Sequence, residues 1–378
     1  MKILLVAMPS LHFYRWSEQL QAAGHELYWF NITDGGAPVS RISFMQQKFG
    51  WKLKWDYPGR TFVKAKLPKL YAFIQRFNEN DTAQVFENYV NEIQPDVVHS
   101  FALYVSCTPI LPVMEKFPKL KWIFSSWGSD LFYFQNIPTY LNDIKRVLPR
   151  VNYLFTDCNR DYHIAKSYGF KGEFLGVFPG GGGFDLEQIA QYKQPLEQRK
   201  AIAIKGFQGR SGRAIEVLKA IISVKEELKD YEIIVFGSDK EVMDFAFQNG
   251  LNTWENFTIK GKISHTAVLE IFGKSLFYIG NSNSDGMPNT LLEAICCGVF
   301  PIQSNPGNVT AELINDGVNG FLIANEENIS EIITTIKKAL SMSNEKISLG
   351  LQTYQTKIHN LDFYKVKEQV IACYKKLE

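Results

Sequence analysis

Short apolar runs alternate with helical stretches along the whole chain, and this rhythm predicts an α/β fold. In the first half the pattern indicates a strand at 2–7, a helix from about Arg15 that Gly24 ends, and a strand at 26–30. Later strands of this half are expected at 96–99, 121–125, 153–156 and 173–178. Helical connections between several of these strands favour a parallel sheet.

The same rhythm starts again at Ala201 and predicts a second α/β domain. Its elements are expected at 201–205, 212–228 (helix), 232–236, 257–260, 275–280 and 299–303. The glycine-rich and polar segment 181–200 is predicted to link a domain at 1–180 to one at 201–355, with a final amphipathic helix within 356–378. The expected picture is two Rossmann-like domains that face each other across a cleft.

Length and composition are those of a globular protein with two cores. The chain has 378 residues, a net charge of +2 and five cysteines without metal-ligand spacing. We expect reduced, buried thiols and a cytoplasmic location, because the apolar start is too short for a signal peptide and no run could span a membrane. The small net charge argues against a nucleic-acid binder.

The charge is nevertheless uneven, because residues 41–76 are strongly basic and aromatic. Nine lysines and arginines stand there against one acid, Asp56, among eight aromatic residues. This mixture suits the anionic inner surface of a membrane, on which the protein would be peripheral. An ordinary loop at a sheet edge is the alternative.

The segment 281–320 contains the most informative motif. Asp285 precedes a predicted helix that starts at Pro288, and Glu293 lies further along that helix. The amides of Asn289 and Thr290, at the positive end of the helix dipole, form a place for an anionic phosphate. The two carboxylates can then accept hydrogen bonds from hydroxyl groups of the same ligand. Alternatively, Asp285 caps the helix and Glu293 only complements its dipole.

This segment resembles the donor site of the retaining family 4 glycosyltransferases, which have the GT-B fold. The resemblance rests on Asp285, seven residues, Glu293, and the later segments 299–303, 305–308 and 316–320. It implies that Glu293 binds the ribose of a nucleotide-sugar and that Asp285 binds the sugar. It also implies diphosphate contacts from Gly286, Met287, Pro288, Asn289 and Thr290, and a last helix that returns to the N-terminal, acceptor-side domain.

A second cluster of cations follows the first strand of the second domain. Lys205, Arg210 and Arg213 lie among small residues, and the resemblance implies that such cations neutralise the leaving diphosphate. Solvated surface charges are the alternative interpretation. The segment around Ile263 stands where related enzymes bind the nucleotide base through backbone groups.

The first half offers weaker candidates. Trp127 stands where relatives carry a histidine, and Asp130 follows it as an expected contact to the acceptor or the sugar. His99 ends a predicted strand and matches a family histidine, and His12 follows the first strand. Each of these histidines is equally compatible with a structural role.

The resemblance implies a retaining, metal-independent glycosyltransferase without a cofactor. The donor would be a UDP or GDP sugar, and the acceptor a saccharide or lipid-linked molecule of bacterial surface polysaccharide or glycolipid assembly. No Asp-x-Asp triple is present, so cations and amides would have to neutralise the phosphates. A non-catalytic nucleotide-sugar-binding or membrane-docking protein, and a nucleotide-sugar 2-epimerase of the same fold, are the alternatives.

Overall fold

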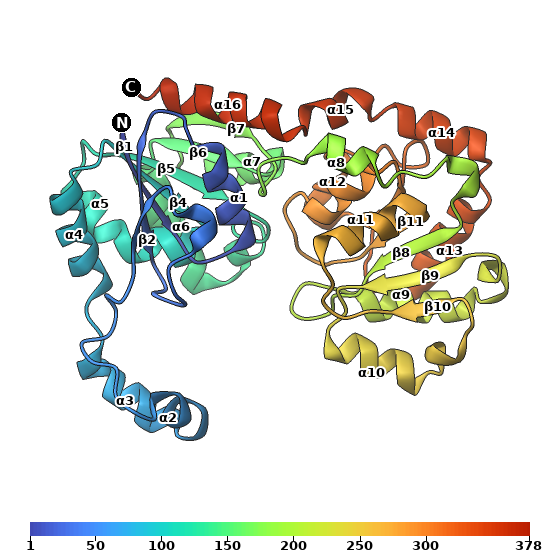
Figure 1. The fold of residues 1–378 in the computed structure, drawn as a ribbon, viewed down its shortest axis with the longest axis horizontal. Helices are drawn as coiled ribbons and strands as arrows, with labels where there is room; N and C mark the ends of the chain where they lie inside the picture. Colours follow the sequence, from blue (N-terminus) through green and yellow to red (C-terminus); the bar gives the residue numbers. More distant parts are fainter. The chain divides into compact units, whose positions relative to one another are not determined.

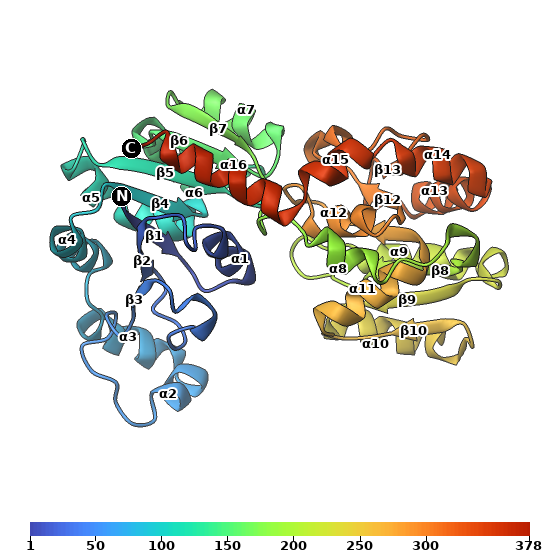
Figure 2. The same cartoon turned by 45° about the horizontal axis from the view of Figure 1, so that its top comes forward.

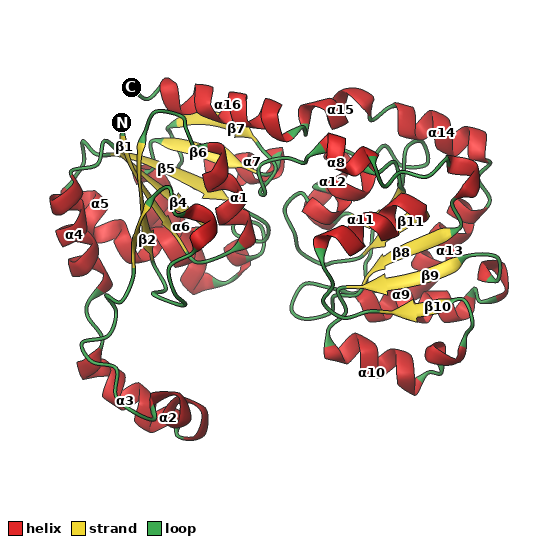
Figure 3. Cartoon of the chain, viewed as in Figure 1, coloured by secondary structure: helices red, strands yellow, loops and turns green.

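A computed structural model describes residues 1–378, which form two compact units (Figure 1). The first unit comprises residues 1–156, 161–177 and 370–378, and the second comprises residues 157–160 and 178–369. Each unit is built around one parallel β-sheet, and Figure 3 shows helices around both sheets. The predicted α/β class with two Rossmann-like domains is confirmed.

The first unit contains a seven-stranded sheet of order β3-β2-β1-β4-β5-β6-β7. Its strands are β1 (Lys2–Ala7), β2 (Glu26–Asn31), β3 (Gln46–Lys48), β4 (Val97–Phe101), β5 (Lys121–Ser126), β6 (Tyr153–Thr156) and β7 (Glu173–Val177). The central β1 pairs Leu4 with Tyr28 on one side and with Val98 on the other. Both faces of the middle strands are buried, as expected for parallel strands covered by helices.

Most helices of this unit pack their apolar faces on the sheet. They are α1 (Leu11–Gln19), α2 (Arg60–Lys66), α3 (Pro68–Asn78), α4 (Thr82–Ile93), α5 (Leu111–Lys116), α6 (Pro138–Val147) and most of α7 (Asn159–Ser167). In α4, Phe86, Val90 and Ile93 recur at helical spacing and are buried, and the side chain of Asp81 caps the helix. α2 and α3 are exceptions, because their large apolar side chains are exposed.

The second unit contains a six-stranded sheet of order β10-β9-β8-β11-β12-β13. Its strands are β8 (Ala201–Lys205), β9 (Glu232–Phe236), β10 (Phe257–Ile259), β11 (Ser275–Gly280), β12 (Phe300–Ser304) and β13 (Phe321–Ile323). Its helices are α8 (Leu186–Ala190), α9 (Ala214–Ser223), α10 (Lys240–Gln248), α11 (His265–Lys274), α12 (Asn289–Cys296), α13 (Ile329–Leu340), α14 (Asn344–Gln352), α15 (Gln355–Asn360) and most of α16 (Phe363–Lys375).

Several boundaries differ from the sequence prediction. α1 begins at Leu11, four residues before the expected Arg15, because the hydroxyl of Ser10 accepts a hydrogen bond from the amide of Phe13 and caps the helix. The expected linker 181–200 belongs to the second unit, where Ile189 of α8 is buried in the core. Within the expected C-terminal segment 356–378, residues up to Gln369 group with the second unit and only Val370–Glu378 group with the first.

The five cysteines are buried and form no disulfide, in agreement with the expected reduced thiols. None of the helices combines the length and the apolar character that crossing a bilayer would require.

Candidate functional site

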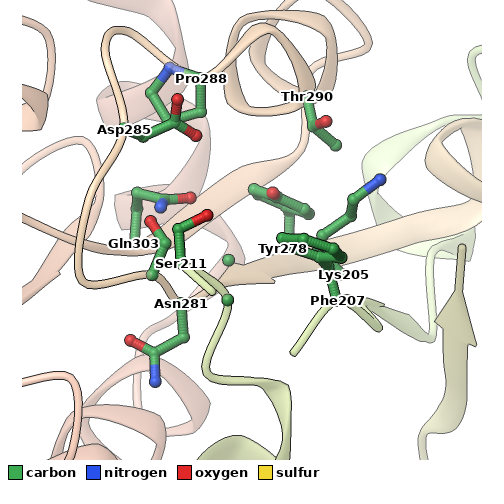
Figure 4. A pocket seen from close by; sticks show the side chains of 12 residues that line it. Lys205, Phe207, Ser211, Tyr278, Asn281, Asp285, Pro288, Thr290 and Gln303 are labelled. Atoms are coloured by element: carbon green, nitrogen blue, oxygen red, sulfur yellow. The ribbon is translucent and has the colours of Figure 1, made fainter. Parts of the chain in front are cut away.

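The carboxyl ends of β8, β11 and β12 surround a small cavity in the second unit. β8 lies between β9 and β11, so the strand order changes direction here, and open α/β sheets bind ligands at such points. The cavity has a volume of about 110 Å³. It is lined by Lys205, Phe207, Ser211, Gly212, Tyr278, Gly280, Asn281, Ser282, Asp285, Pro288, Thr290 and Gln303 (Figure 4).

Lys205 is the last residue of β8 and supplies the positive charge of the cavity. Burial lowers the pKa of its ammonium group, and the negative charges of Glu293 and Asp285 oppose that shift. Its Nζ also lies 5.4 Å from the ring centroid of Phe236. The structure thus brings the predicted cation Lys205 near the two carboxylates of a motif that is distant in sequence.

The loop from β11 to α12 supplies the anion-binding end of a helix. Asp285, Pro288 and Thr290 line the cavity, and Pro288 is the residue before the first helical residue rather than the first one itself. This shift of one position leaves the amides of Asn289 and Thr290 in the first turn, where no carbonyl of the same helix can accept from them. A phosphate contact from these amides at the helix start stays a prediction.

The residues between Asp285 and the helix have different surroundings. The amide of Gly286 donates a hydrogen bond of 2.9 Å to Oδ1 of Asp285. The side chain of Met287 packs against the apolar cluster beneath the site. Neither Gly286 nor Met287 is among the residues that line the cavity, and a diphosphate contact from either stays a prediction.

Glu293 is buried in α12 and does not line the cavity, but it has a partner that the sequence did not predict. Nε2 of His265 lies 2.5 Å from Oε1 of Glu293. His265 is the first residue of α11, which the hydroxyl of Ser264 caps, and Ile263 just before it packs on the same apolar cluster. The only signal in the sequence was that His265 directly follows the segment expected to bind the nucleotide base.

Two residues that line the cavity have amide oxygens without partners. Oε1 of Gln303 and Oδ1 of Asn281 are buried and make no hydrogen bond within the protein. The amide of Asn281 points away from the other lining side chains (Figure 4), and its Nδ2 donates to the carbonyls of Arg213 and Glu326. Buried polar atoms normally have partners, so Oε1 of Gln303 is the oxygen suited to accept a hydrogen bond from a ligand in the cavity. Sequence analysis missed both residues, although each stands at the carboxyl end of a strand, where such contacts are common.

The two predicted arginines lie outside the cavity. Arg213 precedes α9, and its Nε donates a hydrogen bond of 3.0 Å to Oε1 of Glu327. Arg210 is exposed on the same loop. Of the three predicted cations, Lys205 alone lines the cavity, and a diphosphate contact from Arg213 or Arg210 stays a prediction.

Asp130 of the first unit is a buried carboxyl group that holds the backbone. Both of its oxygens accept from the amide of Leu103, at 2.9 and 2.8 Å, just after Ala102 with its positive φ of 65°. Burial, followed by the nearby charge of Asp161, raises the pKa of Asp130 to about 8. In this structure Asp130 supports the turn after β4, and its contact to a sugar or acceptor stays a prediction.

His99 is enclosed within the first unit. Its Nε2 lies 2.8 Å from Oγ of Ser125, and its Nδ1 contacts the hydroxyl of Tyr374, near the end of α16. Burial lowers the pKa of His99 well below its usual value, so the ring is neutral. These contacts support the structural interpretation of His99, because they use both ring nitrogens.

The other two candidates of the first unit lie close to each other. The ring centroids of His12 and Trp127 are 6.2 Å apart, and Trp127 also packs 4.8 Å from Phe101. His12 is exposed at the start of α1, and Trp127 is half-buried. Their roles toward a ligand stay predictions.

Comparison with known proteins shows which proteins this chain is similar to. Residues 187–356 match the family model described as Glycosyl transferases group 1. A curated relative, an uncharacterized glycosyltransferase of Methanocaldococcus jannaschii, is 30% identical over 166 residues, which are 42% of this chain and 41% of the relative. The similarity to the Glycosyl transferases group 1 family thus lies within the second unit, and the chain spans less than half the length of this relative.

Solved structures extend the similarity to the whole chain. The sucrose-phosphate synthase of Thermosynechococcus elongatus matches with a TM-score of 0.70 and 16% identity over 100% of this chain and 99% of its own. HepE of Anabaena, solved with UDP and glucose, matches with a TM-score of 0.65 and 12% identity over 100% of both chains. These structures confirm the GT-B fold, and at such identities they support the fold alone.

Proposed function

We propose that this protein is a glycosyltransferase that moves a sugar from a nucleotide-diphosphate-sugar to a saccharide or lipid-linked acceptor. The observation that carries the proposal is the convergence of Lys205, Asp285 and the start of α12 on one cavity at the carboxyl ends of β8 and β11. A cation and the positive end of a helix suit a diphosphate, whereas a carboxylate and an amide oxygen suit sugar hydroxyls.

The donor roles follow from these positions. The diphosphate lies against the first turn of α12 and the ammonium group of Lys205, and the sugar lies near Asp285 and Gln303. Glu293 accepts from the ribose once the nucleotide reaches the base-side segment around Ile263. The GT-B structure with UDP and glucose bound supports a UDP sugar as the first donor to test, with a GDP sugar as the next.

We propose transfer with retention of configuration. The bond between the anomeric carbon and the diphosphate oxygen breaks, and its electron pair goes to the diphosphate. The acceptor hydroxyl attacks from the same face, and its proton passes to the departing phosphate oxygen. Lys205 and the helix amides stabilise the charge that grows on the leaving group, so we propose that no metal ion is required.

The acceptor would bind to the N-terminal unit. The N-terminal unit provides Asp130, Trp127 and His12 as candidates, and the notion of a bacterial surface polysaccharide or glycolipid as the product comes from the resemblance. Location at the inner face of the cell membrane belongs to the same proposal.

A thermal-shift titration without added metal tests the donor site first. UDP, GDP and ADP are each added alone and as sugar conjugates. One nucleotide should stabilise the protein selectively, and Glu293→Ala should abolish that stabilisation. No shift with any nucleotide would contradict the proposal and favour a non-catalytic protein.

Product analysis tests the reaction itself. Incubation with the stabilising nucleotide-sugar and candidate acceptors should release the nucleotide and yield a glycosylated acceptor with the donor's anomeric configuration. Interconversion of the donor sugar without an acceptor would instead favour a 2-epimerase. Inversion at the anomeric carbon would disprove retention.

A further inference from the structure

Two helices of the first unit form an exposed hairpin that the core does not hold. We call residues 54–78, which contain α2 and α3, the α2–α3 hairpin. Figure 1 and Figure 2 both show it extending away from the sheet of its unit. α2 buries none of its residues, and α3 buries only Gln75 and Asn78. The hairpin is therefore a surface that contributes little to folding.

Hydrogen bonds anchor the base of the hairpin. The side chain of Asn78 is fully buried, donates to the carbonyl of Trp55 at 2.9 Å and accepts from the amide of Trp55 at 3.0 Å. The backbone amide of Lys54 donates to the carbonyl of Asn78 at 2.8 Å. The two ends of the hairpin are thus tied together, so its helices are presented as one unit.

The hairpin carries a stripe of large apolar side chains that face solvent. Leu67 just before α3, and Leu70, Phe73 and Phe77 within α3, recur at helical spacing and are 48, 47, 58 and 61% exposed. Phe62 on α2 is 63% exposed. Such a stripe normally faces a core or marks an interaction surface.

The same hairpin is strongly positive. It contains six cations, Lys54, Arg60, Lys64, Lys66, Lys69 and Arg76, against the single carboxylate of Asp56. Asp56 already accepts a hydrogen bond of 2.6 Å from Nε of Arg60. The other five cations are exposed. A partner must therefore be both anionic and able to receive apolar side chains.

We propose that the α2–α3 hairpin docks on a bilayer surface that contains anionic lipid. Lysines and arginines would contact lipid phosphates, and the Phe and Leu side chains would enter the boundary between headgroups and acyl chains. A second copy of the chain fits less well, because its hairpin would bring the same positive charge. This surface is separate from the donor cavity, and the inference does not depend on sugar transfer.

Sedimentation with lipid vesicles tests the proposal, with no nucleotide present. The full chain should pellet with vesicles of phosphatidylcholine that contain about a third phosphatidylglycerol, and little with phosphatidylcholine alone. High salt should release much of the bound protein, because it screens exposed charges. Absence of binding to the anionic vesicles would overturn the proposal.

Two sets of variants assign the binding to the hairpin. Lys64→Gln/Lys66→Gln/Lys69→Gln should weaken binding by about fivefold for each charge removed. Phe62→Ser/Phe73→Ser should also weaken vesicle binding, and this loss should depend less on the salt concentration than the loss in the lysine variant. Because all five positions are exposed, these changes should leave folding intact.

Matched variants in the second unit serve as controls. Lys200→Gln/Lys229→Gln/Lys346→Gln removes three exposed charges, and Phe247→Ser/Leu349→Ser removes two exposed apolar side chains. Both controls should bind vesicles like the parent. Equal losses in hairpin and control variants would overturn the assignment. So would self-association in sedimentation velocity that Phe62→Ser/Phe73→Ser abolishes, because the hairpin would then pair with a second copy.

Discussion

The imidazole of His265 contacts the carboxylate of Glu293, with Nε2 2.5 Å from Oε1. The side chain of His265 is 51% exposed, whereas that of Glu293 is 10% exposed. The contact joins the first turn of α11 to the middle of α12. A residue at the surface thus orients the buried carboxylate that we propose as the ribose acceptor, which makes His265 a candidate positioning residue.

His265→Ala should therefore weaken binding of the nucleotide that stabilises the protein best. The expected loss is several-fold, because the carboxylate keeps its charge but loses the hydrogen bond that orients it. Glu293→Ala removes the acceptor itself and should cost about 1 to 3 kcal/mol, or roughly ten- to hundredfold. Isothermal titration calorimetry measures both affinities.

His265→Gln should recover much of the affinity, since its amide can donate to the same oxygen. His359→Ala, at an exposed position on α15, is the matched control and should bind like the parent. Tighter binding by His265→Ala would show that His265 competes with the ligand for Glu293 rather than orienting it.

Lys205→Ala should reduce turnover by about 10²- to 10³-fold, as expected when one group that stabilises developing charge is removed. Lys205→Arg keeps the charge and should retain more activity. Lys200→Ala, which removes an exposed lysine, should have no effect. Steady-state release of the nucleotide measures turnover, and a thermal midpoint within a few degrees of the parent shows that folding is intact. Full activity of Lys205→Ala would exclude the proposed role.

The charge of Lys205 should also set an upper pH limit for turnover. Burial lowers the pKa of Lys205, so its ammonium group loses its proton at a lower pH than an ordinary lysine would. Turnover should therefore fall on the alkaline side as the charge disappears. In Lys205→Arg this fall should move to higher pH, because arginine stays charged. An unchanged alkaline limit in that variant would show that another group titrates.

Asp130→Asn tests whether the carboxyl group of Asp130 is protonated in the folded protein. Its folded pKa is about 8, against an ordinary value of 3.8. Between these values the folded state holds a proton that the unfolded state releases, so the contribution of Asp130 to stability is lost as the pH rises, by up to about 1.4 kcal/mol per unit. The thermal midpoint of the parent, relative to the variant, should fall from pH 5 to pH 8.

Asp230→Asn, at an exposed position, is the control and should keep a constant difference from the parent. A constant difference for Asp130→Asn would contradict the raised pKa. Loss of turnover in Asp130→Asn without loss of thermal stability would support the contact to the sugar or acceptor that the sequence predicted.

Much of the fold was predictable because parallel strands are continuous apolar runs. The bounds of β1, β6, β8, β9 and β11 agree with the prediction to the residue. α2 and α3 could not be predicted as helices, since Pro58 and scattered aromatic residues interrupt the pattern. Neither helix packs an apolar face on the core, so the core imposes no helical spacing on its apolar residues. The short β3 and β13 owe their existence to pairing with β2 and β12.

The site was predictable only where its residues are close in sequence. Asp285 and the helix start belong to one local motif, and Lys205 is the last residue of a clear strand. Gln303 and Asn281 enter the cavity because β12 lies beside β11, and no local pattern states that adjacency. His265 reaches Glu293 from a different helix, so only the tertiary structure reveals the contact.

Gly280→Ala should close part of the donor cavity. A Cβ at Gly280 would lie 2.1 Å from Oε1 of Gln303 and 2.6 Å from the hydroxyl of Tyr278, both of which line a cavity of about 110 Å³. The φ angle of Gly280 is not positive, so the backbone itself tolerates alanine. The methyl group should therefore displace Gln303 toward the ligand, and we expect affinity for the nucleotide-sugar to fall at least about tenfold.

Truncation of the Gln303 side chain tests whether its displacement causes the loss of affinity. Gly280→Ala/Gln303→Ala removes the collision with Gln303, although not the one with the Tyr278 hydroxyl. It should bind the nucleotide-sugar better than Gly280→Ala alone, but below the parent because an acceptor is lost. Gly35→Ala, at an exposed glycine whose φ is also not positive, should bind like the parent. Calorimetric titration of these proteins and of the single variant Gln303→Ala measures the coupling. Additive losses of affinity would mean that Gly280 and Gln303 act independently. The proposed collision in the cavity would then not explain the effect of Gly280→Ala.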